Sequence, residues 1–262
     1  MRKMEKGTVG GLLVAATAIA LGFSLEGGRM GQVLQPTAAV IVLGGTLGAV
    51  LVQFPLSVVR QAFAKLRDAF QPSSLEGRAR MEQIMRFAMQ ARRNGMLSLD
   101  PELKKIDDPF FKKALMLAID GIHARELREI MELELMRMEE EEERPARVWE
   151  AAGGFAPTVG ILGAVLGLIQ VMQQLDNIGD VGRGIAVAFV ATLYGVGLAN
   201  LLFLPLAGKL RIRAREAQMV RETTLEGVVA MVEGVSPRAL REKLGAQAGE
   251  RAPIQVAQMV AR

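Results

Sequence analysis

The chain has 262 residues with a formal net charge of +4, half of its residues are hydrophobic, and its mean hydropathy is +0.25. This composition disfavours a wholly water-soluble protein, and the basic residues gather beside long apolar stretches, so we expect membrane lipid and no nucleic acid as a partner. The absence of cysteine excludes disulfides, thiolate metal sites and cysteine nucleophiles. His123 has no second histidine with which to form a ligand pair, so we expect a surface side chain and no metal.

The first two apolar runs predict a membrane hairpin over residues 1–59. Residues 7–25 carry no charge, and a helix of that length spans about 28 Å, close to the hydrocarbon thickness of about 30 Å. The run is too long for a comfortable signal peptide and lacks a small-residue cleavage site followed by a polar domain. Residues 36–59 form the second apolar run.

Residues 60–148 predict a large helical domain. Ser73 and Glu76 form a capping-box pattern that starts a helix over residues 75–93, and Gly95 is expected to end it. Asp108 before Pro109 predicts a second helix, which we expect to continue as far as the acidic run at residues 139–143.

Pro145 is expected to interrupt that helix before the third span. No stretch of the chain alternates like a strand, so the fold class is predicted to be an all-α integral membrane protein. Residues 149–175 and 185–208 predict a second transmembrane hairpin, which occupies residues 149–208, and residues 209–262 predict a C-terminal helix and tail. The tail from residue 245 onward is expected to be loosely ordered.

The charges beside the four predicted spans indicate their orientation. The loops at residues 26–35 and 176–184 carry few basic residues. The opposite ends of the spans are flanked by a large basic set: Arg2, Lys3, Lys6, Arg60, Lys65, Arg67, Arg144, Arg147, Lys209, Arg211, Arg213 and Arg215. The positive-inside rule then places both termini, residues 60–148 and residues 209–262 in the cytoplasm of a bacterial cell, with the spans in the inner membrane.

No Asp, Glu, Lys, Arg or His lies well inside any of the four predicted spans. Proton relays in membranes normally need an ionisable side chain at depth, so a partner chain would have to supply the carboxylate. A solitary pump or transporter is therefore disfavoured, while an uncharged pore for a neutral solute stays open.

Small residues at four-residue spacing predict close helix packing, either within one chain or between copies. They are Gly44 with Gly48, Gly163 with Gly167, and Gly195 with Ala191 and Ala199.

Thr158, Thr192 and Asn200 are the polar residues of the spans that could line a hydrated path. The alternative is that each bonds to its own helix or to a neighbouring one. Pro157 and Pro205 each remove a helix hydrogen bond, which makes either a static kink or a hinge.

In the large loop, Arg92 and Arg93 end one helix and Asp100 and Glu102 follow a short turn. These charges either complement the helix dipole or face a partner. We find no phosphate-cradling loop, no pocket of paired carboxylates and no nucleophile beside a base, so we expect neither an enzyme nor a cofactor.

Five segments resemble the MotA/PomA family, the larger stator subunit of the bacterial flagellar motor in the MotA/TolQ/ExbB proton channel superfamily. They read PTAAVIVLGGTLGAVLVQFP, ARRNGMLSLD, GFAPTVGILGAVLGLIQVM, AVAFVATLYGVGLANLLFLPLAGKL and SPRALREKL. The resemblance implies a homopentameric ring around a MotB-type single-span partner whose transmembrane aspartate takes up the ion. Ion flow would then produce torque on the rotor protein FliG.

The resemblance also implies roles for single residues. Pro157 and Pro205 match prolines that couple ion passage to movement. Threonines of the third and fourth spans line the ion path in the family; Thr192 matches one of them, and Thr158 is the candidate in the third span. Sodium-driven members have a threonine where this chain has Ala164, which favours protons.

For the rotor contact, the family uses an arginine and an acid eight positions later. Arg92 and Asp100 match that spacing, and Arg93 and Glu102 are further candidates.

Two alternatives remain open from the sequence. One is a TolQ/ExbB-like energy-transducing subunit of another envelope or motility machine, but such subunits typically have three spans and an outside amino terminus. The N-terminal hairpin and basic amino terminus of this chain favour the stator. The other is a passive membrane scaffold, which the glycine-rich packing alone would fit.

Overall fold

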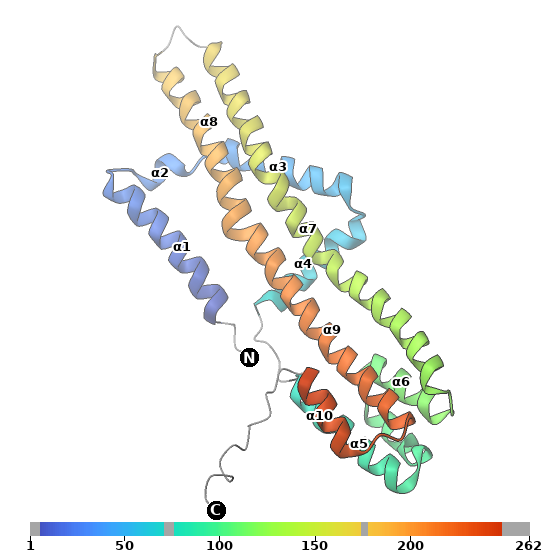
Figure 1. The fold of residues 1–262 in the computed structure, drawn as a ribbon. Helices are drawn as coiled ribbons and strands as arrows, with labels where there is room; N and C mark the ends of the chain where they lie inside the picture. The colour runs from blue at the N-terminus through green and yellow to red at the C-terminus, as the bar shows by residue number, and fades with distance from the viewer. Residues whose placement is uncertain (1–5, 71–75, 174–177, 248–262) are drawn as a thin grey trace, which may run out of the picture. The chain divides into compact units, whose positions relative to one another are not determined.

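The structure is a computed structural model that describes residues 6–70, 76–173 and 178–247 (Figure 1). These residues form helices and no strand, as the sequence predicts. The α-helices are α1 (Lys6–Leu25), α2 (Met30–Val33), α3 (Pro36–Gln53), α4 (Leu56–Ala69), α5 (Glu76–Asn94), α6 (Pro109–Ile119), α7 (Ala124–Met172), α8 (Ile178–Leu198), α9 (Leu204–Val232) and α10 (Pro237–Gln247). A 3₁₀ segment (Met96–Lys105) follows α5, and a π-helical turn (Ala199–Phe203) joins α8 to α9.

The chain divides into two compact units. The first, called the span unit here, comprises Met1–Pro72 and Glu142–Arg213, and the second, the loop unit, comprises Ser73–Glu141 and Ala214–Arg262. Helices α7 and α9 belong in part to each unit.

The span unit contains the apolar helices. Within the described residues, four helical segments are long and apolar enough to cross a membrane: Gly7–Leu25, Pro36–Gln53, a stretch of α7, and a stretch of the helix that runs from Gly184 to Val232. The second predicted span is too long at its end, because α3 stops at Gln53 instead of residue 59. Phe54 is extended, with φ −121° and ψ 143°, as residues before a proline tend to be. The chain resumes as α4 after that proline, Pro55.

Two further boundaries differ from the predictions. Pro145 does not interrupt its helix, since α7 continues through both Pro145 and Pro157. A proline inside a helix removes one backbone hydrogen bond, and buried neighbours such as Trp149 hold the helix together here. The helix that contains the fourth predicted span likewise does not end at residue 208, but continues through α9 to Val232.

The helix predicted to run from Pro109 to the acidic run is in fact two helices. Helix α6 ends at Ile119, and Gly121 takes a φ of +83°, a conformation that glycine adopts at little cost. The backbone N–H of Ile122 donates to the carbonyl of Leu117 at 3.2 Å and closes the turn. Helix α7 then begins at Ala124.

The predicted helix signals in the loop unit are confirmed where the structure describes them. Asp108 caps α6, since its carboxylate accepts the backbone N–H of Phe110 at 2.9 Å. Gly95 follows the last residue of α5 with a φ of +83°. Ser73, the first residue of the predicted capping box, lies outside the described residues, as do residues 248–262 of the tail.

The core of the loop unit brings together five segments that are far apart in sequence. Fully buried side chains come from α5 (Ile84), the 3₁₀ segment (Leu99), α6 (Phe111), α9 (Val228) and α10 (Leu240). Phe111 also stacks on Phe87 of α5, with ring centroids 5.7 Å apart. This core fixes the 3₁₀ segment, and with it the charged residues of the loop.

Candidate functional site

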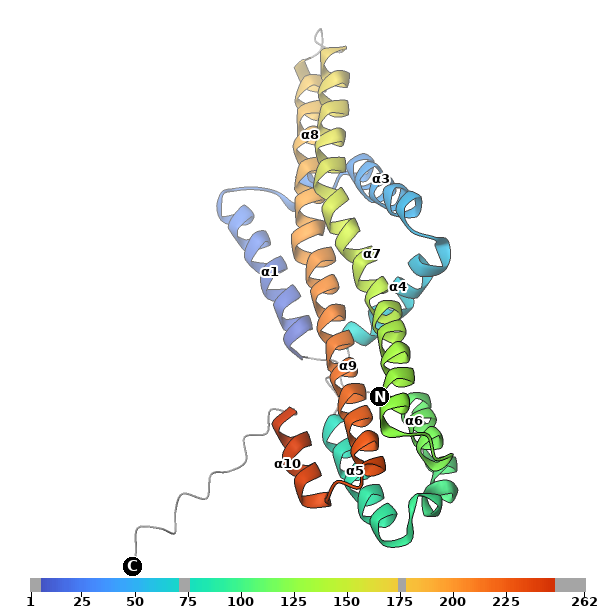
Figure 2. The ribbon, with the colours of Figure 1, turned by 45° about the vertical axis from the view of Figure 1, so that its right-hand side comes forward.

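The third and fourth spans lie side by side along much of their length (Figures 1 and 2). Where they meet, a Cβ added at Gly160 would lie 2.8 Å from the carbonyl oxygen of Ala191 and 3.1 Å from the Cα of Gly195. A Cβ added at Gly195 would in turn lie 3.0 Å from the Cα of Gly160. The two backbones therefore touch, and neither position has room for a side chain.

Two more of the predicted small residues extend this contact between α7 and α8, which is called the seam below. A Cβ at Gly163 would lie 2.9 Å from the Cβ of Ala191, and one at Gly167 would lie 3.1 Å from that of Ala188. Packing within the chain is thus confirmed for Gly163 and Gly167. It is not the role of the other predicted pair, because added Cβ atoms at Gly44 and Gly48 would meet nothing within 4 Å.

The polar residues of these spans are bonded within their own helices. Thr158 donates to the carbonyl of Phe155 at 2.8 Å, and Asn200 donates to that of Val196 at 2.9 Å. Thr192 reaches the carbonyl of Ala188 only at 3.5 Å, the longest of the three bonds. Its hydroxyl is the one held most weakly, and it sits in the seam beside Ala191.

The two prolines lie close to a contact between α7 and α9. A Cβ at Gly153, one turn before Pro157, would lie 2.6 Å from the Cδ2 of Leu204, the residue before Pro205. The π-helical turn Ala199–Phe203 directly precedes this contact. A proline has no N–H to donate, and π turns interrupt regular helical bonding, so both irregularities fall at one place on the fourth span.

An aromatic cluster that the sequence did not predict surrounds that place. Trp149 of α7 contacts Phe63 of α4 edge-on, with ring centroids 5.0 Å apart, and Phe203 of the π turn at 5.8 Å. Its indole N–H donates to the carbonyl of Ala62 at 3.2 Å. Trp149 therefore links α4, α7 and the π turn of the span unit.

The charged candidates of the loop lie on the surface of the loop unit. Arg92, Arg93 and Asp100 are exposed, and none of them forms an ion pair with another residue that the structure describes. Glu102 differs, because it is half-buried and Lys105 donates to it at 2.8 Å. The structure thus leaves the Arg92 and Asp100 charges available, whereas that of Glu102 is partly neutralised.

A neighbouring apolar side chain was missed by the sequence analysis. Leu97 is 75% exposed, although Leu99 and Leu103 of the same 3₁₀ segment are buried. The segment is held to α5 by Gln90, whose side-chain amide donates to the carbonyl of Ser98 at 2.8 Å. An exposed leucine among charges is a surface feature that only the fold reveals, since the pattern of leucines alone does not say which one is buried.

A half-buried carboxylate joins three helices of the loop unit. Glu226 of α9 pairs with Arg128 of α7 and, at 2.7 Å, with Lys243 of α10. The hydrogen bond from Arg128 is the main cause that lowers the pKa of Glu226 to about 2, with Lys243 acting in the same direction against burial. The ion cluster therefore stabilises the folded loop unit while Glu226 is charged.

Acid is expected to weaken the loop unit through Glu226. Because the pKa of Glu226 is lower in the folded than in the unfolded chain, its contribution is present above about pH 4.5 and is lost toward about pH 2. Comparing denaturant unfolding of the full chain in detergent near pH 5 and pH 3 should show a loss of about 1 kcal/mol after allowance for solvent screening. Glu226→Gln should abolish this part of the loss. Glu129→Gln, the control, removes a carboxylate from an exposed ion pair and should retain the loss. Equal pH dependence in both variants would contradict the role of Glu226.

The apolar segments of the spans contain no Asp, Glu, Lys, Arg or His, as the sequence predicts. The described residues hold no group of three or more His, Cys, Asp or Glu side chains that could bind a metal. The polar groups available there are hydroxyls, amides and backbone carbonyls. These can solvate a passing ion or bind water, but they cannot take up a proton at neutral pH.

Comparison with known proteins identifies the family. Residues 102–223 match the family model of the MotA/TolQ/ExbB proton channel family, and residues 9–95 match that of the motility protein A N-terminal region, which covers the hairpin of α1 and α3. Motility protein A of Bacillus subtilis is 34% identical over 92% of this chain and 90% of its own length.

Solved structures agree. A chain of the C. jejuni MotAB structure has a TM-score of 0.89 at 31% identity and covers 97% of this chain and 100% of its own. A chain of the flagellar MotAB stator complex from Bacillus subtilis has a TM-score of 0.83 at 33% identity and covers 92% and 94%. On the strength of this identity across nearly its whole length, the chain belongs to the MotA/TolQ/ExbB proton channel family and, within it, to the motility protein A subunits of the flagellar stator.

Proposed function

We propose that this subunit forms the wall of a proton path whose carboxylate belongs to a MotB-type single-span partner. The observation that carries the proposal is the absence of Asp, Glu, Lys, Arg and His from the apolar segments of the spans. A protein that conducts protons must bind them at depth, so the group that binds them belongs to another chain. The two solved relatives are complexes of MotA with MotB, which supports a partner of that kind.

Thr192 and Thr158 are proposed to line the path. Thr192 lies where α7 and α8 approach most closely. Its hydroxyl forms a weaker hydrogen bond than that of Thr158, so it can turn to an ion or water at little cost. Thr158 is exposed on the surface of this chain, where a partner helix could cover it.

Pro157 and Pro205 are proposed to couple ion passage to movement. The contact of Gly153 with Leu204 places a close approach of α7 and α9 beside both prolines, and the π turn lies next to it. Because α7 and α9 each continue from the span unit into the loop unit, a bend at either proline would be passed along a continuous helix.

The loop unit is proposed to lie in the cytoplasm and to contact FliG through Arg92, Arg93 and Asp100, with Glu102 as a weaker acidic contributor. The exposed Leu97 stands in the same segment as Asp100 and would supply an apolar contact inside a charged rim. Both termini are proposed to be cytoplasmic, and the subunit is proposed to form a homopentamer in the inner membrane.

Swimming of a bacterium that lacks its own stator genes tests the function. We expect swimming when this chain is expressed with the MotB-type partner from the same source, and none when the membrane aspartate of that partner is changed to asparagine. Swimming that persists with the asparagine partner would show that the ion carrier lies elsewhere. Normal membrane levels without swimming in either case would point to another envelope machine.

A further inference from the structure

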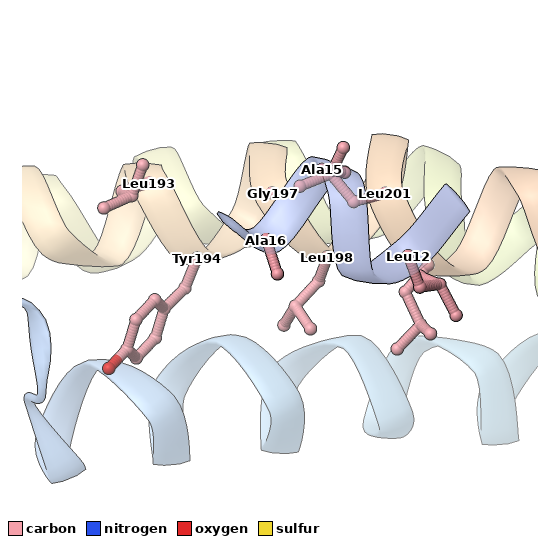
Figure 3. Close-up of a pocket in the computed structure, with 9 residues that line it drawn as sticks. Leu12, Ala15, Ala16, Leu193, Tyr194, Gly197, Leu198 and Leu201 are labelled. Carbon is pink, nitrogen blue, oxygen red and sulfur yellow. The ribbon is translucent and has the colours of Figure 1, made fainter. Parts of the chain in front are cut away.

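A groove lies between α1 and the fourth span within the span unit (Figure 3). Its volume is about 290 Å³. Leu12 and Ala16 line it on the α1 side, and Leu193, Gly197 and Leu201 line it on the other. An added Cβ at Gly197 would meet nothing within 4 Å, so this glycine leaves the groove open.

The lining offers hydrocarbon and no available polar group. Its polar side chain is Tyr194, whose hydroxyl donates to the carbonyl of Val33 at 2.6 Å and accepts the backbone N–H of Gln35 at 3.2 Å. A polar ligand would lose its hydration in this groove without gaining partners. The groove therefore suits an apolar occupant.

The surroundings of the groove identify that occupant. Both walls belong to segments apolar enough to cross a membrane, and the apolar stretch of α1 has none of its residues buried in the chain. The hydrocarbon that such helices meet in a bilayer is the acyl chain of a lipid. An acyl chain in the groove would restore the packing that the open space between α1 and the fourth span lacks.

A cation stands beyond one end of the groove. Lys209 of α9 donates to the hydroxyl of Thr8 on α1 at 2.7 Å, which joins the two helices that form the walls. Thr8 precedes Leu12 by one helical turn. Lys209 follows Leu202, another residue that lines the groove, by about two turns, or about 10 Å. A lysine about two helical turns beyond the end of the groove lies where a lipid phosphate would be when an acyl chain fills the groove.

We propose that this groove binds an anionic phospholipid, with one acyl chain between α1 and the fourth span and its phosphate beside Lys209. The lipid would fasten α1 to the fourth span, to which the chain itself joins it by few contacts such as the Lys209–Thr8 bond. This proposal does not depend on the ion path or on the rotor.

Native mass spectrometry of the purified full chain with phosphatidylglycerol tests the proposal. Gly197→Leu would fill the groove and should reduce retention of phosphatidylglycerol by about tenfold or more, since several buried methylenes lose their place. Lys209→Gln keeps a hydrogen-bond donor but removes the charge, and should reduce the preference for phosphatidylglycerol over phosphatidylcholine by about fivefold. Lys209→Arg should retain that preference.

The matched control is Gly182→Leu, which makes the same change on α8 at an exposed glycine with nothing within 4 Å of an added Cβ. It should retain phosphatidylglycerol like the wild type. Equal retention by wild type and Gly197→Leu would overturn the proposal. So would cross-linking between copies by a photoreactive amino acid placed at Ala16, because the groove would then be filled by a second subunit.

Discussion

Replacing Gly195 by valine is expected to abolish swimming and to reduce the assembled protein in the membrane to a small fraction of the wild-type amount. A Cβ at this position would lie 2.5 Å from the carbonyl oxygen of Ala156 and 3.0 Å from the Cα of Gly160. Overpacking costs about 1–3 kcal/mol even where side chains can move aside. Here the obstructing atoms are backbone, so the helices themselves must separate.

Separation at Gly195 would affect more than one contact. The same seam of α7 and α8 contains Gly160, Gly163 and Gly167. At each of them, an added Cβ would lie within 3.2 Å of an atom of the opposite helix. Solubilisation followed by size-exclusion chromatography of the tagged chain would measure the assembled fraction. Gly182→Val is the control on the same helix, α8, because its added Cβ has open space. If Gly195→Val assembles and swims like this control, the close approach of α7 and α8 is not what holds the spans together.

Charge reversal at Arg92 is expected to stop swimming while leaving the amount of protein in the membrane unchanged. Arg92 is exposed and forms no ion pair with another described residue, so its loss should not unfold the loop unit. A reversed charge at a docking surface, in contrast, sets like charges against each other and costs several kcal/mol.

The control for this variant is Arg238→Glu on α10, which changes another exposed and unpaired arginine of the loop unit that the structure describes. Swimming in soft agar and membrane immunoblots would be compared between the two variants. Restoration of swimming by an opposite charge reversal on the rotor protein would identify the contact directly. Equal loss of swimming in both variants, or loss of membrane protein with Arg92→Glu alone, would contradict a docking role for Arg92.

The sequence predicted those parts of the fold that depend on local pattern. The four apolar segments follow from composition, and the cap at Asp108 and the stop at Gly95 follow from residue type. The predictions that were wrong concern helix boundaries that depend on packing between helices. Pro145 carries the local signal of a helix break, yet the helix continues because its neighbours are buried against other helices. The turn at Gly121 was missed because the apolar residues of the two helices on either side of it continue at helical spacing.

In the candidate site, too, some residues could be predicted from the sequence and others only from the packing. Arg92 and Asp100 could be predicted from their spacing in a resembling family, and the structure finds both exposed. Gly160 and Trp149 could not, because a glycine or a tryptophan in an apolar run does not reveal which helix faces it. Their roles depend on contacts between segments far apart in the chain.

This subunit is proposed to provide the ion path, while its partner provides the ion carrier. The decisive measurement is proton flux into cells or vesicles that contain this chain alone, compared with the same chain plus its aspartate-bearing partner. We expect no flux above the membrane background from the chain alone, since its spans hold no Asp, Glu, Lys, Arg or His, and a clear flux with the partner. Equal flux with and without the partner would mean that this chain carries protons by itself.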